Sequence, residues 1–434
     1  MTKRFAVAAA VLGAGHAHAG GLELPIQGVH AMERAGALVA GASDADALWL
    51  DPAGLASFAG KGTQGLAFDV AYLYQPVTYT PSDPTQGHVS NQQPGEPLPS
   101  LAGAVGLDDR WVVAGGLTWK YIPTSRYDPM GVQRYASNGL DGSQFVQLVA
   151  GVAYVVSPRL RVGATVQDLV TLLDLKLVAS ACPGAMTCDA SYDLPLEVKE
   201  TDAFAPSASV GVQYDALPEL VLGATLQAPT SVSAAGALTL TAPAAPALRG
   251  MAITGTQATA SFWLPPSARA GVEYHDGVLA LEAAVDVELW SLHDSIAIAP
   301  DDVKLGTATL SAMAIARDYK TSVAVSLGGE VHLGHVQLGA GVAYETAAAP
   351  TADVSVLTVD APKLILALGG GYAADGWQVG VAASFVHQAD VDVTDPAVAE
   401  LEPLRTAGAA PVYINGGTYH AFDVLAGLRM ARKF

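Results

Sequence analysis

The most constraining feature of this sequence is a repeated alternation of apolar and polar residues that is never accompanied by a long apolar run. In segment 278–290 the odd positions carry Leu, Ala and Val, whereas the even positions include Glu282, Asp286 and Glu288. A period of two places these sets on opposite faces of a strand. The longest apolar stretches have about eleven residues, against the roughly 20 that a membrane-spanning helix needs. Only 15% of the residues are charged and 51% are hydrophobic, which is too apolar for a typical soluble domain.

The same alternation predicts fourteen strands. Their expected ranges are 63–75, 99–107, 111–121, 143–156, 160–177, 202–214, 220–229, 258–274, 278–290, 320–332, 336–347, 355–372, 377–390 and 417–434. The connections between them are alternately short and long, as in outer-membrane barrels with short periplasmic turns and long outer loops. We therefore predict an all-β fold, a membrane-spanning antiparallel β-barrel of 14 strands, with both termini in the periplasm.

The alternation also assigns charged residues to the inside of this barrel. By position, Lys120, Arg269, Glu282, Asp286 and Glu288 face the lumen. A charge that faced lipid at mid-bilayer would cost about 2–4 kcal/mol. The formal net charge of −19 disfavours nucleic acid as a partner.

Both ends of the chain indicate export to the outer membrane of a Gram-negative cell. Residues 1–19 combine Lys3 and Arg4, an apolar stretch and the small-residue site Ala17-His18-Ala19, the order of a secretory signal peptide cleaved after Ala19. The alternating last strand ends at Phe434 and resembles the C-terminal assembly signal of bacterial outer-membrane proteins. The expected partners are therefore the barrel assembly machinery, outer-membrane lipid and lipopolysaccharide, and we expect a monomer.

The two cysteines, Cys182 and Cys188, lie six residues apart. In an oxidising compartment a disulfide that closes a short loop is the default for such a pair. A metal site is disfavoured because no second pair of ligands accompanies them.

Residues 20–60 lack the strand pattern. Asp44 is a candidate helix cap and Pro52 a candidate helix end, and about 40 residues are too few to bury a core of their own. We therefore expect segment 20–60 to form a hatch, or plug, inside the lumen of a barrel built from residues 61–434.

A Gly-Val-x-Tyr phrase recurs at 151–154, 211–214, 271–274 and 341–344. Its spacing follows the strands, so we interpret it as repeated strand architecture rather than as a ligand motif.

Several short stretches resemble the long-chain fatty acid and aromatic hydrocarbon outer-membrane transporter family (FadL/TodX-like). They are Arg34-Ala35-Gly36-Ala37, Asp51-Pro52-Ala53-Gly54-Leu55, Leu264-Pro265-Pro266 ahead of Gly271-Val272-Glu273-Tyr274, Trp290-Ser291 and the closing aromatic residue. The resemblance implies a fourteen-stranded barrel, a hatch carrying the motif Asp51, Pro52 and Ala53, and a substrate that leaves sideways where the third strand kinks inward. Asp51 stands where the family usually has Asn, which changes the hydrogen bonding at that position.

Gly115 and Gly116 are the candidates for this kink, because glycine inside a strand often marks a bulge or bend. The alternative is that they are small residues beneath the hatch, and the sequence does not choose between the two.

The resemblance implies passive uptake of hydrophobic small molecules, fatty acids or hydrocarbons, by lateral diffusion. The excess of acids in the lumen fits a neutral cargo at least as well as a fatty acid anion. A general diffusion porin and a structural or adhesive barrel are the alternatives. We expect no enzyme, cofactor or metal, because no catalytic triad spacing or dinucleotide motif occurs and His332 and His335 lack a third ligand.

Overall fold

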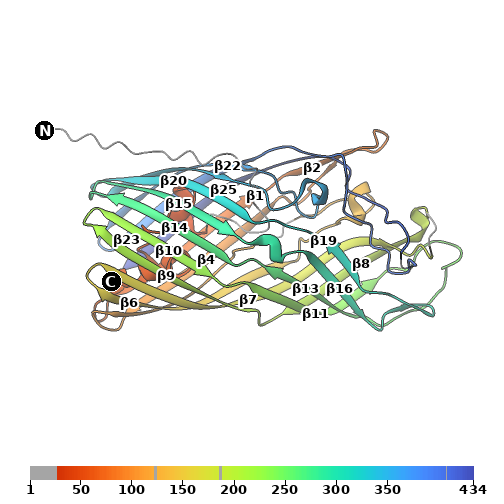
Figure 1. Cartoon of the computed structure of the whole chain (residues 1–434), viewed down its shortest axis with the longest axis horizontal. Helices are drawn as coiled ribbons and strands as arrows, with labels where there is room; N and C mark the ends of the chain where they lie inside the picture. Colours follow the sequence, from red (N-terminus) through yellow and green to blue (C-terminus); the bar gives the residue numbers. More distant parts are fainter. Residues whose placement is uncertain (1–26, 122–124, 185–187, 407) are drawn as a thin grey trace.

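The computed structural model describes residues 27–121, 125–184, 188–406 and 408–434, and in them the chain forms an all-β closed antiparallel barrel of 14 strands (Figure 1). The predicted fold class is thereby confirmed. The predicted signal peptide and the first residues of the predicted hatch segment lie outside the described residues.

The wall is built from strands that pair with their neighbours in chain order. They are β1 (Gln64–Tyr74), β4 (Gly95–Gly106), β5 (Trp111–Thr118), β6 (Gln144–Ser157), β7 (Leu160–Ser180), β9 (Pro206–Leu217), β10 (Leu220–Gln227), β14 (Ser267–His275), β15 (Leu279–Glu288), β20 (Ser322–Leu333), β21 (Val336–Glu345), β22 (Lys363–Ala374), β23 (Trp377–Gln388) and β25 (Gly417–Lys433). Strand β25 pairs with β23 on one side and with β1 on the other, from Gly65 opposite Lys433 to Tyr74 opposite Val424. This last pairing closes the ring and leaves no sheet edge in the wall.

The two ends of the barrel differ. The short turns and the C-terminus lie together at the left end of Figure 1, whereas the long connections extend to the right. The hatch region, in red and orange, lies inside the barrel toward the short-turn end.

Strand β22 illustrates why the alternating residues form a wall. Leu364, Leu366 and Leu368 point outward and are 41%, 50% and 68% exposed, whereas Ile365 and Ala367 point inward and are almost fully buried. Water would penalise such a leucine surface, but a bilayer receives it without cost.

Two predicted strands are wrong in their extent. Segment 355–372 forms a strand only from Lys363, where β22 begins. Segment 258–274 is divided into β13 (Gln257–Leu264) and β14 (Ser267–His275). Pro265 and Pro266 stand at the break, and proline cannot donate to a strand ladder. Strand β14 belongs to the wall, whereas β13 pairs with β11 (Thr230–Leu240) and β16 (Ser295–Asp301) outside it.

The long connections contain further strands that the sequence pattern did not predict. Strands β8 (Asp193–Asp202), β11, β13, β16 and β19 (Met313–Ala316) continue the sheet from the end of β7. Their buried faces form an apolar cluster that includes Leu175, Leu196, Leu238 and Ile298. The remaining strands are short: β2 (Val77–Pro81), β3 (Val89–Ser90), β12 (Ile253–Thr254), β17 (Lys304–Leu305), β18 (Ala308–Thr309) and β24 (Val391–Val393).

The helical segments have at most seven residues. They are α1 (Val29–Glu33), η1 (Ala45–Leu48), η2 (Pro52–Phe58), η3 (Val132–Tyr135), η4 (Ala190–Tyr192), η5 (Trp290–Leu292) and η6 (Thr351–Asp353). All helices in the described residues are too short or too polar to cross a bilayer.

Candidate functional site

The part of the predicted hatch that the structure describes, residues 27–60, packs against the inner face of the wall through α1, η1 and η2. Asp51 begins η2: its Oδ1 accepts a hydrogen bond from the backbone N of Ala53 at 3.0 Å, and Pro52 occupies the first turn. This is the usual chemistry of a helix start. Asp51 is fully buried, and burial raises its pKa well above the usual range, against the lowering effect of the Ala53 N–H.

Two arginines bind the hatch to the wall, Arg34 from the hatch and Arg429 from the wall. From the hatch, Arg34 Nη2 lies 2.6 Å from Glu273 Oε2 of β14 and 3.6 Å from Glu282 Oε2 of β15. Glu282 also accepts hydrogen bonds of 2.7–3.0 Å from the backbone N–H groups of residues 39–41. These contacts cross-link the middle of the hatch to two wall strands.

From the wall, Arg429 of β25 reaches the hatch at Asp44 and Asp46, just beyond the segment held by Glu282. Its guanidinium pairs with Asp44 at 2.8 Å, with Asp46, and with Asp69 of β1 at 3.0 Å. Asp69 in turn accepts a hydrogen bond from the backbone N of Val29 at 2.9 Å. Because Arg429 is buried, these charges are compensated within the protein rather than by water.

Inward-facing wall glycines leave room for the hatch. A Cβ on Gly151 would lie 2.7 Å from Leu48 Cδ1, and a Cβ on Gly271 would lie 3.1 Å from Val39 Cβ. The corresponding neighbours of Gly211 and Gly341 are Asp51 and Arg34 of the hatch. These four glycines are the first residues of the four Gly-Val-x-Tyr phrases, so the repeat marks the places where the wall touches the hatch.

Strand β5 is shorter than both of its neighbours. It ends at Thr118, whereas β4 continues unpaired on that side over residues 95–100 and β6 over residues 144–146. After Thr118 the chain turns into the lumen, where Lys120 Nζ donates to Gln227 Oε1 of β10 at 3.1 Å. The wall is therefore interrupted between β4 and β6.

Side chains bridge this interruption. Gln144 Nε2 of β6 donates to Glu96 Oε1 of β4 at 2.8 Å, and Trp119 Nε1 donates to Gln144 Oε1 at 3.1 Å. The interruption is thus closed by three polar side chains and not by backbone pairing.

Aromatic residues cluster in the lumen on the long-loop side of the hatch. Trp290, His293 and Tyr319 have ring centroids 5.2–5.9 Å apart, and Phe262 lies 5.9 Å from His293. We call Phe145, Phe262, Trp290, His293 and Tyr319 the aromatic cluster. These rings pack against one another and are almost fully buried, so they form a mainly apolar cluster.

Two polar groups face this cluster without full hydrogen bonding. The guanidinium of Arg317 is 2% exposed, lies over the Tyr319 ring and is 3.4 Å from the Tyr319 hydroxyl. In the described part of the chain no carboxylate forms a close ion pair with it, although its charge also acts on Asp353. His293 Nδ1 lies 2.7 Å from the carbonyl oxygen of Trp263, so it carries the proton and donates, while Nε2 is left as a free acceptor. Burial and, to a smaller extent, the nearby Arg317 together lower the pKa of His293 to about 4, so the ring is neutral near pH 7.

Comparison with known proteins identifies the family. A family model described as outer membrane protein transport protein (OMPP1/FadL/TodX) matches residues 10–421. The chain belongs to the FadL/TodX family. This confirms the resemblance seen in the sequence.

Solved structures of the FadL/TodX family have the same fold. A Pseudomonas aeruginosa FadL homologue superposes with a TM-score of 0.80 at 16% identity, over 95% of this chain and 99% of that one. The Pseudomonas putida toluene transporter TodX gives 0.64 at 16% identity, over 93% and 98%. The Ralstonia pickettii toluene transporter TbuX gives 0.63 at 15% identity, over 93% and 98%. No curated protein sequence matches the chain.

In this FadL/TodX protein the five predicted lumen residues make different contacts. Glu282 is part of the hatch contacts and Lys120 of the inward segment after β5. Arg269 Nε pairs with Asp286 Oδ2 at 2.6 Å across β14 and β15, and Glu288 Oε2 accepts from Trp290 Nε1 at 2.5 Å. Glu288 therefore holds one ring of the aromatic cluster in place.

Gly115 and Gly116 lie within continuous pairing of β5 to β4 and to β6, with no shift of register. A Cβ on Gly116 would lie 3.1 Å from Leu48 Cδ2 of the hatch. The inward departure of the chain begins after Thr118, two residues beyond the glycines.

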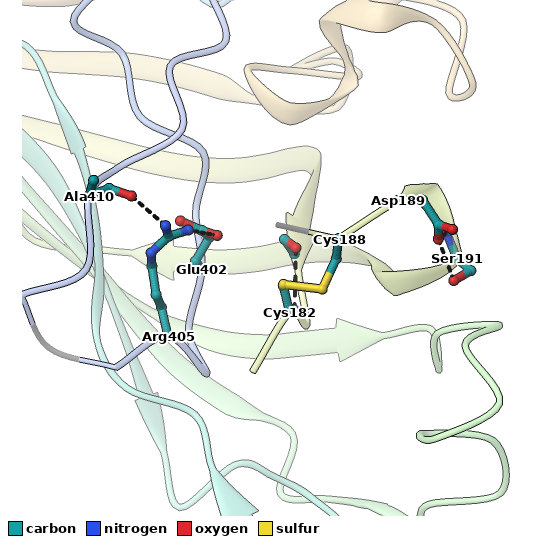
Figure 2. The surroundings of a disulfide bond; sticks show 8 residues. Cys182, Cys188, Asp189, Ser191, Glu402, Arg405 and Ala410 are labelled. Atoms are coloured by element: carbon teal, nitrogen blue, oxygen red, sulfur yellow. Dashed lines mark hydrogen bonds and ion pairs between the residues drawn. A yellow bond between two sulfur atoms is a disulfide. The ribbon is translucent and has the colours of Figure 1, made fainter. Parts of the chain in front are cut away.

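Cys182 and Cys188 form a disulfide with Cα atoms 5.7 Å apart, in the connection after β7. Figure 2 shows it beside a second loop, in which Arg405 pairs with Glu402 and donates to the carbonyl oxygen of Ala410. The backbone N of Thr406 donates to the carbonyl oxygen of Gly184 at 3.0 Å. The disulfide thus constrains a loop against which the last long connection packs.

The sequence did not predict the role of Arg317, the hatch partners of Arg429 or the Glu96–Gln144 bridge. Asp44 and Asp46 lie far from Arg429 in the chain, and Glu96 lies far from Gln144. Alternation indicates only which face a residue is on. The Gly-Val-x-Tyr repeat was the one available signal for the hatch contacts.

Proposed function

We propose that this outer-membrane protein takes up hydrophobic molecules passively, and that they leave sideways through the wall at the end of β5. In this proposal the long-loop end faces the outside and the short-turn end, with both termini of the mature chain, faces the periplasm. The end of strand pairing at Thr118, with residues 119–121 turned inward, is the observation that carries it.

The hatch supports a sideways exit. It contacts wall strands around the ring and is tied to them by Arg34 and Arg429, so a straight path to the periplasm would require breaking buried ion pairs. A sideways path separates the Glu96, Gln144 and Trp119 side chains, which are joined by hydrogen bonds rather than by backbone pairing. An apolar molecule gains about 25 cal/mol for each Å² that it keeps from water, so exit into the bilayer is favoured over exit into the periplasm.

The aromatic cluster supports a mainly apolar cargo, and Arg317 supports one with an acidic end. The relatives include toluene transporters and a FadL homologue, so hydrocarbons and fatty acids both belong to the candidates. A buried guanidinium without a carboxylate partner favours a ligand that supplies one. We therefore propose a monocarboxylic acid with an apolar body as the cargo. Several of the lumen acids noted in the sequence lie at the hatch contacts, but Glu288 contacts the aromatic cluster through Trp290.

A cross-link across the interruption tests the exit. Cysteines replace Glu96 and Gln144, and a short reducible bifunctional reagent joins them in cells that take up a radiolabelled fatty acid. Uptake is expected to fall to the level of a strain without the protein and to recover on reduction. A matched pair at Gln147 and Gln167, which hydrogen-bond at 2.6 Å between the intact strands β6 and β7, is expected to leave uptake unchanged.

Uptake that persists with the Glu96–Gln144 pair cross-linked contradicts the lateral exit. The porin alternative is tested in planar bilayers, where it requires large steady conductance from the purified protein. A structural or adhesive barrel would bind neither fatty acid nor hydrocarbon.

The acidic end of the cargo is tested by Arg317→Gln. Binding of a long-chain fatty acid to the purified protein is expected to weaken about tenfold or more, since a buried charged hydrogen bond contributes roughly 1.5–3 kcal/mol. Binding of toluene is expected to stay within about twofold. Arg249→Gln, in an exposed loop, serves as control, and an equal loss for both ligands would refute the role of Arg317.

A further inference from the structure

At the end of the hatch near the short turns, a histidine and two carboxylates converge from two separate parts of the chain. His30 Nε2 lies 3.2 Å from Glu330 Oε2 of β20 and 4.0 Å from Glu33 Oε1. One ligand atom from each of the three residues lies within 4.8 Å of the other two. His30 and Glu33 are one turn apart on α1, and Glu330 is 300 residues further along.

The other nitrogen of His30 decides how this group can be used. His30 Nδ1 lies 2.8 Å from Asp44 Oδ2, so a neutral ring carries its proton on Nδ1 and donates it to Asp44. The lone pair is then on Nε2, which points at two carboxylates. A nitrogen in this position is stabilised either by a second ring proton, which it donates to Glu330, or by a metal cation that takes the place of that proton. A carboxylate on the far nitrogen is also the usual way in which proteins orient a metal-binding histidine.

The spacing suits a small divalent cation. Ligands at about 2.0–2.1 Å from a tetrahedral zinc ion are roughly 3.3 Å from one another, close to the 3.2 Å between His30 Nε2 and Glu330 Oε2. Glu33 Oε1, at 4.0 Å from His30 Nε2, would have to move less than about 1 Å toward that nitrogen to reach the same ligand spacing. Gln337 donates its amide to both carboxylates, at 2.7 Å to Glu33 Oε1 and also to Glu330 Oε2, and so fixes their orientation.

A small cavity adjoins two of the three ligands, His30 and Glu33. It is lined by residues that include His30, Glu33, Gln337, Gln378 and Arg429. Gly370, Gly371 and Gly380 form part of the same lining and carry no side chain into it. The cavity gives room for a water ligand at a fourth position. His332 lies between Glu330 and solvent, since its Nε2 is 3.2 Å from Glu330 Oε1 and its side chain is 43% exposed.

We propose that His30, Glu33 and Glu330 form a binding site for a divalent transition metal, with zinc as the best fit, and that the bound ion fastens helix α1 of the hatch to strand β20 of the wall. One imidazole with two carboxylates is a donor set typical of zinc and its neighbours. The ion would offset the charge of two buried glutamates, for which the nearby arginines are engaged elsewhere. The site does not depend on which cargo passes through the barrel.

The test uses the full mature protein in detergent, stripped with EDTA and titrated with zinc by calorimetry, and with cobalt as an optical probe. One zinc ion per chain is expected, with a visible cobalt absorption of a four- or five-coordinate site. His30→Gln and Glu330→Gln are expected to weaken binding at least 100-fold. His335→Gln, the same change in a turn at the same end of the barrel, is expected to bind as the wild type does.

A second readout separates binding from folding. Each variant is first shown to be a folded barrel by its altered mobility on unheated gels. Zinc is then expected to slow hydrogen exchange of the α1 amides in the wild type and in His335→Gln, but not in Glu330→Gln. Absence of stoichiometric binding to the wild type overturns the proposal, and so does binding that survives in folded His30→Gln and Glu330→Gln proteins.

Discussion

A methyl group added at Gly223 tests whether the wall is shaped around the hatch. Gly223 lies on the inner face of β10, and a Cβ there would be 2.6 Å from Ala40 Cα, 2.8 Å from Ala40 N and 3.0 Å from the carbonyl carbon of Val39. All three neighbours are hatch backbone, which cannot rotate away as a side chain would. An ordinary contact of 3.4 Å requires a movement of the hatch by about 0.8 Å.

The size of the effect follows from a comparison with Gly380. This glycine also faces inward, on β23, but its Cβ would have no neighbour closer than 3.6 Å. Both Gly→Ala changes gain the same 0.5–1 kcal/mol or so of strand preference. Their difference therefore isolates the clash, and overpacking of this kind costs about 1–3 kcal/mol.

Hydrogen exchange of the hatch measures this cost directly. A loss of 1–3 kcal/mol raises the population of the open hatch by about 5- to 150-fold, and exchange of the amides around residues 38–50 is expected to accelerate by that factor in Gly223→Ala and not in Gly380→Ala. Equal protection of the hatch amides from hydrogen exchange in the two folded variants would show that the wall glycines do not determine the position of the hatch.

Three further predictions concern charge and covalent links. Arg429→Gln leaves Asp44, Asp46 and Asp69 without their shared cation and is expected to destabilise the hatch by about 3–5 kcal/mol. Hatch exchange measures this loss, with Arg432→Gln as the control, since Arg432 is half-buried over the rings of Trp377 and Phe434 and not in the hatch contacts. Asp51→Asn removes a buried carboxyl whose pKa is raised in the native state, so the native state holds this proton more tightly than the unfolded chain and wild-type stability falls as pH rises above about 4. The unfolding temperature of Asp51→Asn relative to wild type is therefore expected to increase from pH 5 to pH 8. A difference that stays constant over this range contradicts the prediction. Reduction of Cys182–Cys188 is expected to speed proteolysis near residues 401–406 while barrel stability is unchanged; equal cleavage before and after reduction would show that the disulfide does not support the loop.

The wall was readable from the sequence because its constraint is local. Alternate residues of each strand meet lipid or the lumen, so the pattern in residues 278–290 or 377–390 is sufficient to locate β15 and β23. Strands β8 and β16 of the long connections were not predicted, although β8 alternates the buried Leu194, Leu196 and Val198 with more exposed residues. Alternation by itself does not distinguish a strand that meets lipid from one that packs within a long connection. The pair Pro265 and Pro266 indicates in the sequence that the strand breaks before β14, but the strand was predicted to run through it.

The interior depended on contacts between distant residues. The presence of a segment without strand pattern at 20–60 and the recurring Gly-Val-x-Tyr phrase are written in the chain, and so is the excess of inward charges. Which glycine receives which hatch residue, which acids Arg429 compensates, and the meeting of His30 with Glu330 were decided only when the ring closed. Alternation fixes the face of a residue but not its depth or its partner across the lumen, because those follow from strand register, tilt and the path of the hatch.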